Sequence, residues 1–466
     1  MKAQPRLKST RTLKVLASQA KAVVPGGLEP DLWAERVVFG TVALHALWWI
    51  LGIQVFVYPG VGWYLFYRSF NRPARVPLPL GWQMWLVYIG VWICSVIVSL
   101  AIGTAEVGRS ITATGSILGV WTLIPVVWYA VRRLRVRYQV VVRAVCWLGV
   151  CQLIAVIIGQ AHLELTGSIV KTQSLITSVV PSLPAEIFFH ANLYSFDKLD
   201  WQTRIPRLVS FYYWSPLAGT MSMIVSMVTL GERNYIWRCL GVLGGLTTLW
   251  YAASRSGQVG VAVAAFVTLW FGSQLGRKLL MWSLIPLSFM SPMILQRLHH
   301  YFFVYRRDSA TAREELHAES LQAFLKSPIL GYGAQGRSNV LDLPLGSHSQ
   351  FYSTIYHTGV IGAAVLIVAW IAVTVALLRL VLKRPTLAPT LGAWVGLSFT
   401  MVSAELAAAS VTVFVLAAWF GCAWNWDQRL TIKAQRPWIP DLPTLEPATP
   451  WQSLSQWWQG TGPSRR

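Results

Sequence analysis

Long runs of apolar residues, separated by short polar segments, dominate this chain. Clear examples cover residues 81–103, 115–131 and 140–159. A helix needs roughly 20 consecutive apolar residues to cross a bilayer, and a backbone in hydrocarbon must satisfy its own hydrogen bonds. Charged residues make up only 12% of the chain, against roughly 25% in a soluble domain. The runs therefore predict an all-α polytopic membrane protein.

Basic residues between the runs predict the orientation of the chain. The sequence RRLRVR at 132–137 follows an apolar run, and basic loops of this kind stay in the cytoplasm. Residues 37–68, interrupted by Pro59 and Gly60, must then cross twice to keep the basic N-terminus inside. Further runs cover residues 216–231, 236–253, 259–271, 279–295, 350–378, 387–401 and 407–424. We therefore predict about 12 transmembrane helices with both termini in the cytoplasm.

This topology divides the chain into three parts. Residues 1–36 form a basic cytoplasmic tail, residues 37–425 the transmembrane domain, and residues 426–466 a proline-rich cytoplasmic tail. Periplasmic loops are expected at 161–215 and 296–349, and short helices are expected in the second.

Charge and cysteine content exclude several classes of protein. The net charge of +21 lies in loops and tails beside apolar runs, without a nucleic-acid-binding motif. We therefore expect membrane lipids as partners and no nucleic acid. The five cysteines fall within apolar stretches and lack the spacing of metal ligands, so neither disulfides nor a zinc site is expected.

Two arginines are predicted at the outer membrane face. Arg255 stands between Ser254 and Ser256, and these small neighbours leave space for an anionic ligand. The alternative is an arginine that only reaches into the headgroups. Arg313 is expected in the first turn of a short helix capped by Thr311, where a cation opposes the helix dipole. This conflict favours a ligand-facing role, with a salt bridge to a neighbouring glutamate as the alternative.

His348 is the strongest candidate for a catalytic base. It stands in LPLGSHSQFY, next to Ser349, where a polar segment meets a long apolar run. Histidine has an unperturbed pKa suited to accepting a proton near neutral pH. His357, further along the same helix, is expected to pack in the core or against a pocket wall.

The segment at 331–336 reads GYGAQG and matches the pattern GxGxxG. No strand precedes it and no βαβ unit surrounds it, so we reject a dinucleotide-binding fingerprint. The glycines instead predict a turn at Tyr332 and Gly333 whose backbone approaches a ligand, with Arg337 directed at phosphate. A plain loop turn fits equally well.

Three motifs together resemble the bacterial O-antigen ligase and polymerase family. They are SRSG at the end of an apolar run, then AREELHAESLQAFLKSPILGYG, then GSHSQFYSTIYHTGVIG entering a long helix. The resemblance covers residues 210–380. Departures from the family pattern are Ser349 where asparagine is common, His317 where tryptophan is usual, and His357 where an acidic residue often stands.

The resemblance implies a GT-C-like glycosyltransferase of the bacterial inner membrane. Such an enzyme takes a glycan from a polyprenyl-diphosphate donor at the periplasmic face and transfers it to a lipid or glycan acceptor. His348 would deprotonate the acceptor hydroxyl, and Arg255 and Arg313 would hold the diphosphate, with His317 in the pocket. The outer loops show no acidic pair at this site, so we expect no metal and no cofactor. A single direct displacement would invert the sugar.

Alternative functions remain open at this stage. A repeat-unit polymerase or a protein O-oligosaccharyltransferase would use the same residues. A transporter of an anionic or lipid-linked substrate would need ionisable residues deep within its spans, and these spans offer little beyond Glu405.

Overall fold

The computed structural model describes residues 29–72, 76–170, 172–180, 188–195, 206–300, 307–406 and 409–435. Most of the two predicted tails therefore lies outside the described residues. By its contacts the chain forms two units, Met1–Asn425 and Trp426–Arg466, and the candidate site belongs to the first.

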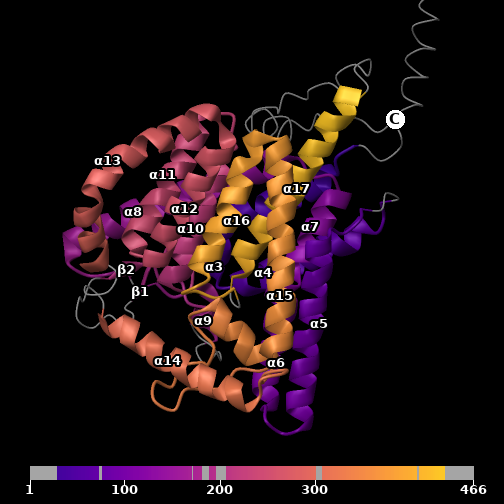
Figure 1. The fold of residues 1–466 in the computed structure, drawn as a ribbon, viewed down its shortest axis with the longest axis vertical. Coiled ribbons are helices and arrows are strands. Elements are labelled where there is room, and N and C mark those ends of the chain that lie inside the picture. Colours follow the sequence, from indigo (N-terminus) through magenta and orange to yellow (C-terminus); the bar gives the residue numbers. More distant parts are fainter. Residues whose placement is uncertain are drawn as a thin grey trace, which may run out of the picture. The chain divides into compact units, whose positions relative to one another are not determined.

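The described residues are almost entirely helical (Figure 1). The first half contains α2 (Leu32–Ala43), α3 (His45–Leu51), α4 (Gln54–Ser69), α5 (Leu80–Ala101), α6 (Val107–Ser116), a π-helical segment (Ile117–Trp121), α7 (Leu123–Arg133), α8 (Tyr138–Thr166) and α9 (Leu175–Val179). The second half contains α10 (Ser215–Thr229), α11 (Tyr235–Ala252), α12 (Arg255–Gly272), α13 (Gln274–His299), α14 (Arg307–Lys326), α15 (Gln350–Lys383), a 3-10 turn (Pro385–Leu387), α16 (Ala388–Thr400) and α17 (Ser410–Gln435). A two-residue antiparallel pair, β1 (Tyr194–Ser195) with β2 (Arg207–Leu208), joins Tyr194 to Leu208.

Every apolar run predicted after residue 80 forms a helix, which confirms an all-α membrane protein. The predicted number of about 12 spans is not confirmed. By length and composition, five helices among the described residues can cross a membrane, or six if the bent pair α2 and α3 counts as one. Several of the other helices are short, such as α10 with 15 residues and α16 with 13. Because each residue adds about 1.5 Å, helices of this length do not span the hydrocarbon alone.

The first apolar run folds back on itself, as predicted, but it turns at a different place. Pro59 lies inside α4, and the break instead falls at Gly52, whose φ of 75° ends α3. The left-handed conformation there favours glycine. Asp31 before α2 accepts a hydrogen bond of 3.1 Å from Arg68 near the end of α4, so the chain returns to the end from which it started.

Ion pairs gather the predicted cytoplasmic loops at one end of the helices. Asp31 also binds Arg72, at 3.2 Å, and Glu35 binds Arg137 at 2.6 Å. Arg133 donates a 3.2 Å hydrogen bond to the carbonyl of Arg72. We call this cluster the basic end. Its members come from the N-terminal segment and from two loops that positive charge assigned to one side of the membrane.

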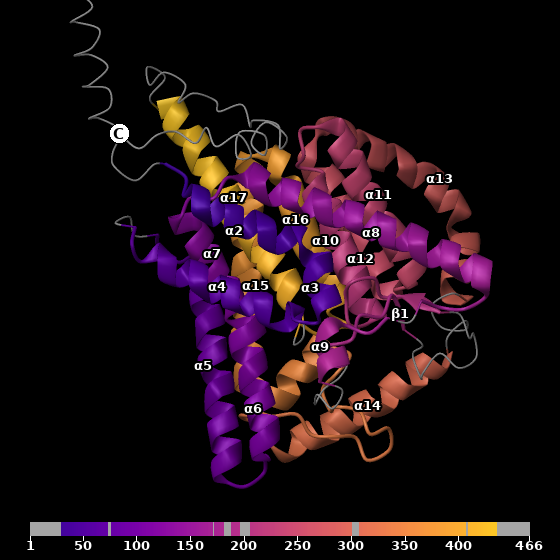
Figure 2. The same ribbon diagram turned by 180° about the vertical axis from the view of Figure 1, so that it is seen from behind.

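Helices α5 and α15 run antiparallel from the basic end to the opposite end, where α14 lies (Figures 1 and 2). A side chain at Gly81, near the start of α5, would lie 2.5 Å from Val373. Further along α5, the Trp92 indole donates a 2.8 Å hydrogen bond to the carbonyl of Gly333. The polar segment before α15 therefore lies far from the basic end, as the predicted topology requires.

Helices α12 and α16 are also antiparallel and pack through small residues. A side chain at Gly260 would lie 2.5 Å from the Thr400 methyl group, and Gly392 faces the backbone of Ala264. The start of α12 is thereby level with the end of α16. Arg255 consequently lies at the same end as the linker that follows Thr400.

Candidate active site

His348 lies in the turn that leads into α15. Its φ of 64° is left-handed, which is uncommon for a residue with a side chain and costs backbone strain. Ser349 then occupies the N-cap position, so the predicted helix start is confirmed. The amide of Gly346 donates a 2.8 Å hydrogen bond to the hydroxyl of Ser320 on α14. The turn that holds His348 is thus fixed to a second helix.

Helix α14 begins earlier than the sequence predicted. It starts at Arg307, so Thr311 lies inside the helix and Arg313 lies in its second turn. The argument from an opposed helix dipole is therefore wrong, because the dipole acts mainly within the first turn. The predicted end is correct: the helix stops at Lys326, shortly before Pro328.

Arg313, His317 and His348 come together across α14 and the turn before α15. The His317 ring stacks on Tyr352 of α15, with centroids 4.1 Å apart and planes at 12°. Burial, together with the charges of Arg313 and His317, lowers the pKa of His348 to about 4. Burial and Arg313 also lower the pKa of His317. Both imidazoles are therefore neutral at pH 7.

The GYGAQG segment braces the site. The amides of Tyr332 and Gly333 donate to the carbonyls of Tyr356 and His357, at 2.8 and 2.9 Å. These two amides are thus committed to backbone partners. Gly359 interrupts α15 with a φ of 60° and ψ of −162°, which leaves room for the segment to dock. The turn predicted at Tyr332 and Gly333 is present, and the bonds of these two amides agree with the plain loop turn.

Two further predicted residues have defined surroundings. Arg337 forms a 2.8 Å ion pair with Asp342, and both side chains are well exposed, at 61% and 79%. Its role in phosphate binding stays a prediction. His357 is buried and stacks on Trp92 with centroids 5.2 Å apart, so it packs in the core as predicted.

Arg255 is the first residue of α12 and follows a tight turn. The Ser254 hydroxyl caps the helix by accepting from the amide of Gly257 at 3.3 Å, and Ser256 lies in the first turn. The turn itself is held by buried Arg207, which donates a 3.2 Å hydrogen bond to the carbonyl of Ala252. Because the amide of Gln350 bonds to the carbonyl of Met401 at the end of α16, Arg255 lies at the same end of the helices as His348.

One acidic residue at this end was not assigned to the site by the sequence. Glu405 lies in the linker between α16 and α17, and burial raises the pKa of its carboxyl to about 7. The Ser353 hydroxyl, one turn into α15, hydrogen-bonds to this carboxyl. One feature of the sequence could have identified Glu405: it is an isolated acidic residue in an apolar stretch. Burying such a residue costs free energy, so it usually has a function.

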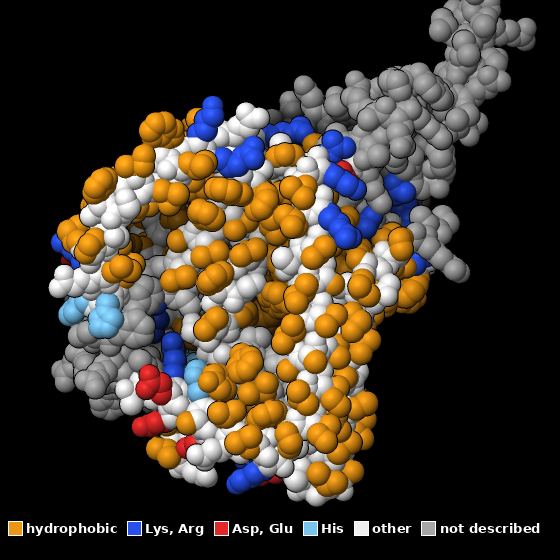
Figure 3. All heavy atoms as spheres, in the orientation of Figure 1, with side chains coloured by type: hydrophobic (Ala, Val, Ile, Leu, Met, Phe, Trp, Pro, Cys, Tyr) orange, Lys and Arg blue, Asp and Glu red, His pale blue; other side chains and the backbone are white. Residues whose placement is uncertain are grey.

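The charge distribution separates the two ends of the molecule. Figure 3 shows Lys and Arg side chains along the upper edge and a mixed group of basic, acidic and histidine side chains at the lower left, where α14 lies. Within the described part of the chain, no three His, Cys, Asp or Glu side chains form a group that could hold a metal ion.

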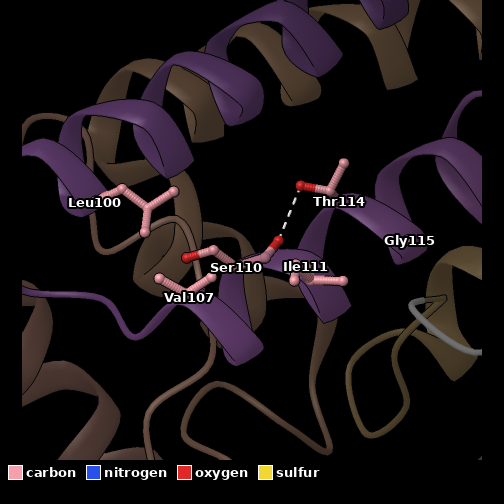
Figure 4. Close-up of a pocket in the computed structure, with 6 residues that line it drawn as sticks. All are labelled: Leu100, Val107, Ser110, Ile111, Thr114 and Gly115. Carbon is pink, nitrogen blue, oxygen red and sulfur yellow. Dashed lines mark hydrogen bonds between the residues drawn. The ribbon is translucent and has the colours of Figure 1, made fainter.

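A cavity of about 400 Å³ opens between the end of α5 and α6 (Figure 4). Its lining is largely aliphatic, and the polar Thr114 hydroxyl is used in a 2.8 Å bond to the carbonyl of Ser110. None of the residues that line it is ionisable: Leu100, Val107, Ser110, Ile111, Thr114 and Gly115. The cavity therefore offers no ionisable side chain for proton transfer.

Comparison with known proteins places these residues in one family. Residues 240–367 match a family model described as O-antigen ligase. This segment runs from α11 into α15 and contains Arg255, Arg313 and His348. No curated protein matches the chain. Residues 240–367 of this chain are therefore similar to the O-antigen ligase family.

Proposed function

We propose that this protein transfers a glycan from a polyprenyl-diphosphate donor to an acceptor hydroxyl. The observation that carries the proposal is the grouping of Arg313, His317 and His348 within the segment that matches O-antigen ligase. The family supports glycosyl transfer at a membrane in general. The donor, the acceptor and the roles of single residues are our inference.

The reaction needs one base and a site for a departing anion. His348 would accept the proton of the acceptor hydroxyl while its oxygen attacks the anomeric carbon of the donor sugar. The bond from that carbon to the diphosphate breaks, and Arg255 and Arg313 would hold the leaving charge. A general base contributes roughly 10²- to 10⁴-fold to such a rate. One displacement of this kind inverts the anomeric centre and requires no metal.

The low pKa of His348 is consistent with this role. Burial and the charge of Arg313 disfavour a proton on the imidazole. A diphosphate bound at Arg313 would offset that charge and raise the basicity of His348. The base would thus remain unprotonated until the donor binds, and gain strength when it does.

The orientation follows from the two ends of the molecule. The basic end, with Arg72, Arg133 and Arg137, fits the cytoplasmic side. The opposite end, with α14 and His348, would then face the periplasm from the bacterial inner membrane. About 12 spans and a GT-C-like arrangement remain part of this proposal.

The test is transfer by purified protein in lipid nanodiscs, with a lipid-linked glycan as donor. His348→Ala should lower transfer at least about 100-fold with unchanged thermal unfolding, and His162→Ala on α8 is the matched control. Transfer by His348→Ala at the wild-type rate would refute the assignment. Offering a lipid, a repeat unit and a protein as acceptors separates ligase, polymerase and protein transferase. Movement of the donor without a covalent product would indicate a transporter.

A further inference from the structure

The linker between α16 and α17 is clamped onto the first residue of α15. The backbone amide of Gln350 donates a 2.8 Å hydrogen bond to the carbonyl of Met401. Its side-chain oxygen accepts a 3.0 Å hydrogen bond from the amide of Leu406. Gln350 therefore holds both ends of the segment 401–406, and Glu405 is fixed against the helix that His348 precedes.

The Glu405 carboxyl is only partly satisfied. Ser353 hydrogen-bonds to it, while its Oε2 atom is buried and has no hydrogen-bond partner among the described residues. A buried polar atom of this kind costs free energy unless a ligand or water completes it. With a pKa raised to about 7 by burial, much of the carboxyl is protonated at neutral pH. A protonated carboxyl both donates and accepts hydrogen bonds.

The position of Glu405 connects it to the proposed donor site. Because α12 and α16 are antiparallel, the linker after Thr400 is level with Arg255. Because Gln350 clamps the same linker, it also adjoins the turn of His348. The candidate site at this end of the molecule thus contains four charged or titratable groups: Arg255, Arg313, His317 and His348. Glu405 is the acidic residue held between two helix starts.

The chemistry of the donor indicates what would complete this carboxyl. The group joined directly to the diphosphate is a sugar, and its hydroxyls lie beside the phosphates. An ionised carboxylate there would repel the diphosphate, whereas a neutral carboxyl would not. A bound diphosphate would itself favour the protonated form.

We propose that Glu405 binds a hydroxyl of the sugar that is joined to the diphosphate. This inference rests on the proposed function, and it makes Glu405 a sugar-binding residue. His348 acts on the acceptor and the arginines act on the phosphates. Glu405 would then fix the orientation of the sugar between them.

The test compares two lipids of equal charge in nanodiscs. One is undecaprenyl-diphosphate N-acetylglucosamine, and the other is undecaprenyl diphosphate capped by a methyl group. The wild type should bind the sugar lipid about tenfold more tightly, the effect expected of a well-placed hydrogen bond in a dry site. Glu405→Ala should reduce this preference to less than about twofold, with unchanged affinity for the methyl lipid. Glu405→Gln should keep most of the preference, because the amide is neutral and still donates and accepts.

Each other outcome has a clear meaning. Equal weakening of both lipids by Glu405→Ala would refute the inference, because the residue would then act on the diphosphate or on folding. An unchanged preference in Glu405→Ala would also refute it. If the wild type binds both lipids equally, the inference about Glu405 fails but the proposed function is unaffected. If it binds neither lipid, the proposed function fails as well. Glu164→Gln, an exposed position on α8, is the matched control and should behave as the wild type.

Discussion

The low pKa of His348 predicts an unusual pH profile for transfer. At pH 5.5 an imidazole with the ordinary pKa of 6.5 is about one-tenth neutral, whereas one with a pKa of about 4 is almost fully neutral. If His348 is the base, kcat/KM should therefore stay nearly constant from pH 7 to 5.5. With an ordinary histidine it would fall about tenfold over that range. Because kcat/KM reports the ionisations of the free enzyme, the profile gives the pKa of His348 before the donor binds.

Substitution of Arg313 tests the cause of the low pKa of His348. Its charge contributes to the low pKa of His348, so Arg313→Gln should raise that pKa and move the acidic limb to higher pH. Arg313→Lys keeps the charge and should leave the limb near its original position. Both variants should have a lower maximum kcat/KM because donor binding is weakened. The pH at which the acidic limb falls does not depend on that maximum.

The assay is initial-rate transfer in nanodiscs from pH 4.5 to 8. The measurements are made in the Glu405→Gln background, because the Glu405 carboxyl, with a pKa of about 7, would otherwise titrate within this range. Both phosphates of a diphosphate diester remain ionised throughout. An acidic limb near pH 6.5 in the Glu405→Gln background would refute the reasoning, and so would a limb that adding Arg313→Gln leaves in place.

Three further predictions concern stability and the outer loop. Gly359→Ala should destabilise the protein by about 3 kcal/mol or more, because the backbone conformation favours glycine and the new methyl group would collide with the carbonyl of Ile329. Thermal unfolding in detergent measures this loss. Gly90→Ala is the control and should cost little, because Gly90 faces open space. Arg143→Gln should cost about 3 kcal/mol because it leaves the buried carboxylate of Glu232 unpaired; adding Glu232→Gln should recover part of the loss in the same assay, and no recovery would contradict the pairing. Arg337→Ala should change stability by less than about 1 kcal/mol, since its ion pair is exposed; a large loss of donor binding in the lipid assay, with unchanged stability, would assign Arg337 to the diphosphate.

The sequence alone predicted the membrane class and the positions of the helices. Long apolar runs admit few structures in a bilayer, because the backbone must bond to itself there. The basic loops around Arg72 and Arg133 were assigned to one side, and ion pairs and a backbone bond gather them at one end. The order of motifs around Arg255, Arg313 and His348 also indicated the family, and residues 240–367 match it.

Only the tertiary structure decided how the predicted residues meet. Helix α14 already runs from Arg307 through Thr311, which the local capping signal at Thr311 did not reveal. Two amides of GYGAQG, those of Tyr332 and Gly333, bond to carbonyls of α15 just before its break at Gly359. Nothing in the sequence indicated that these two segments pair. Glu405 adjoins the start of α15 because Gln350 clamps a linker more than 50 residues away in the chain. Long-range contacts of this kind set the burial, and burial sets the pKa values on which the proposed chemistry depends.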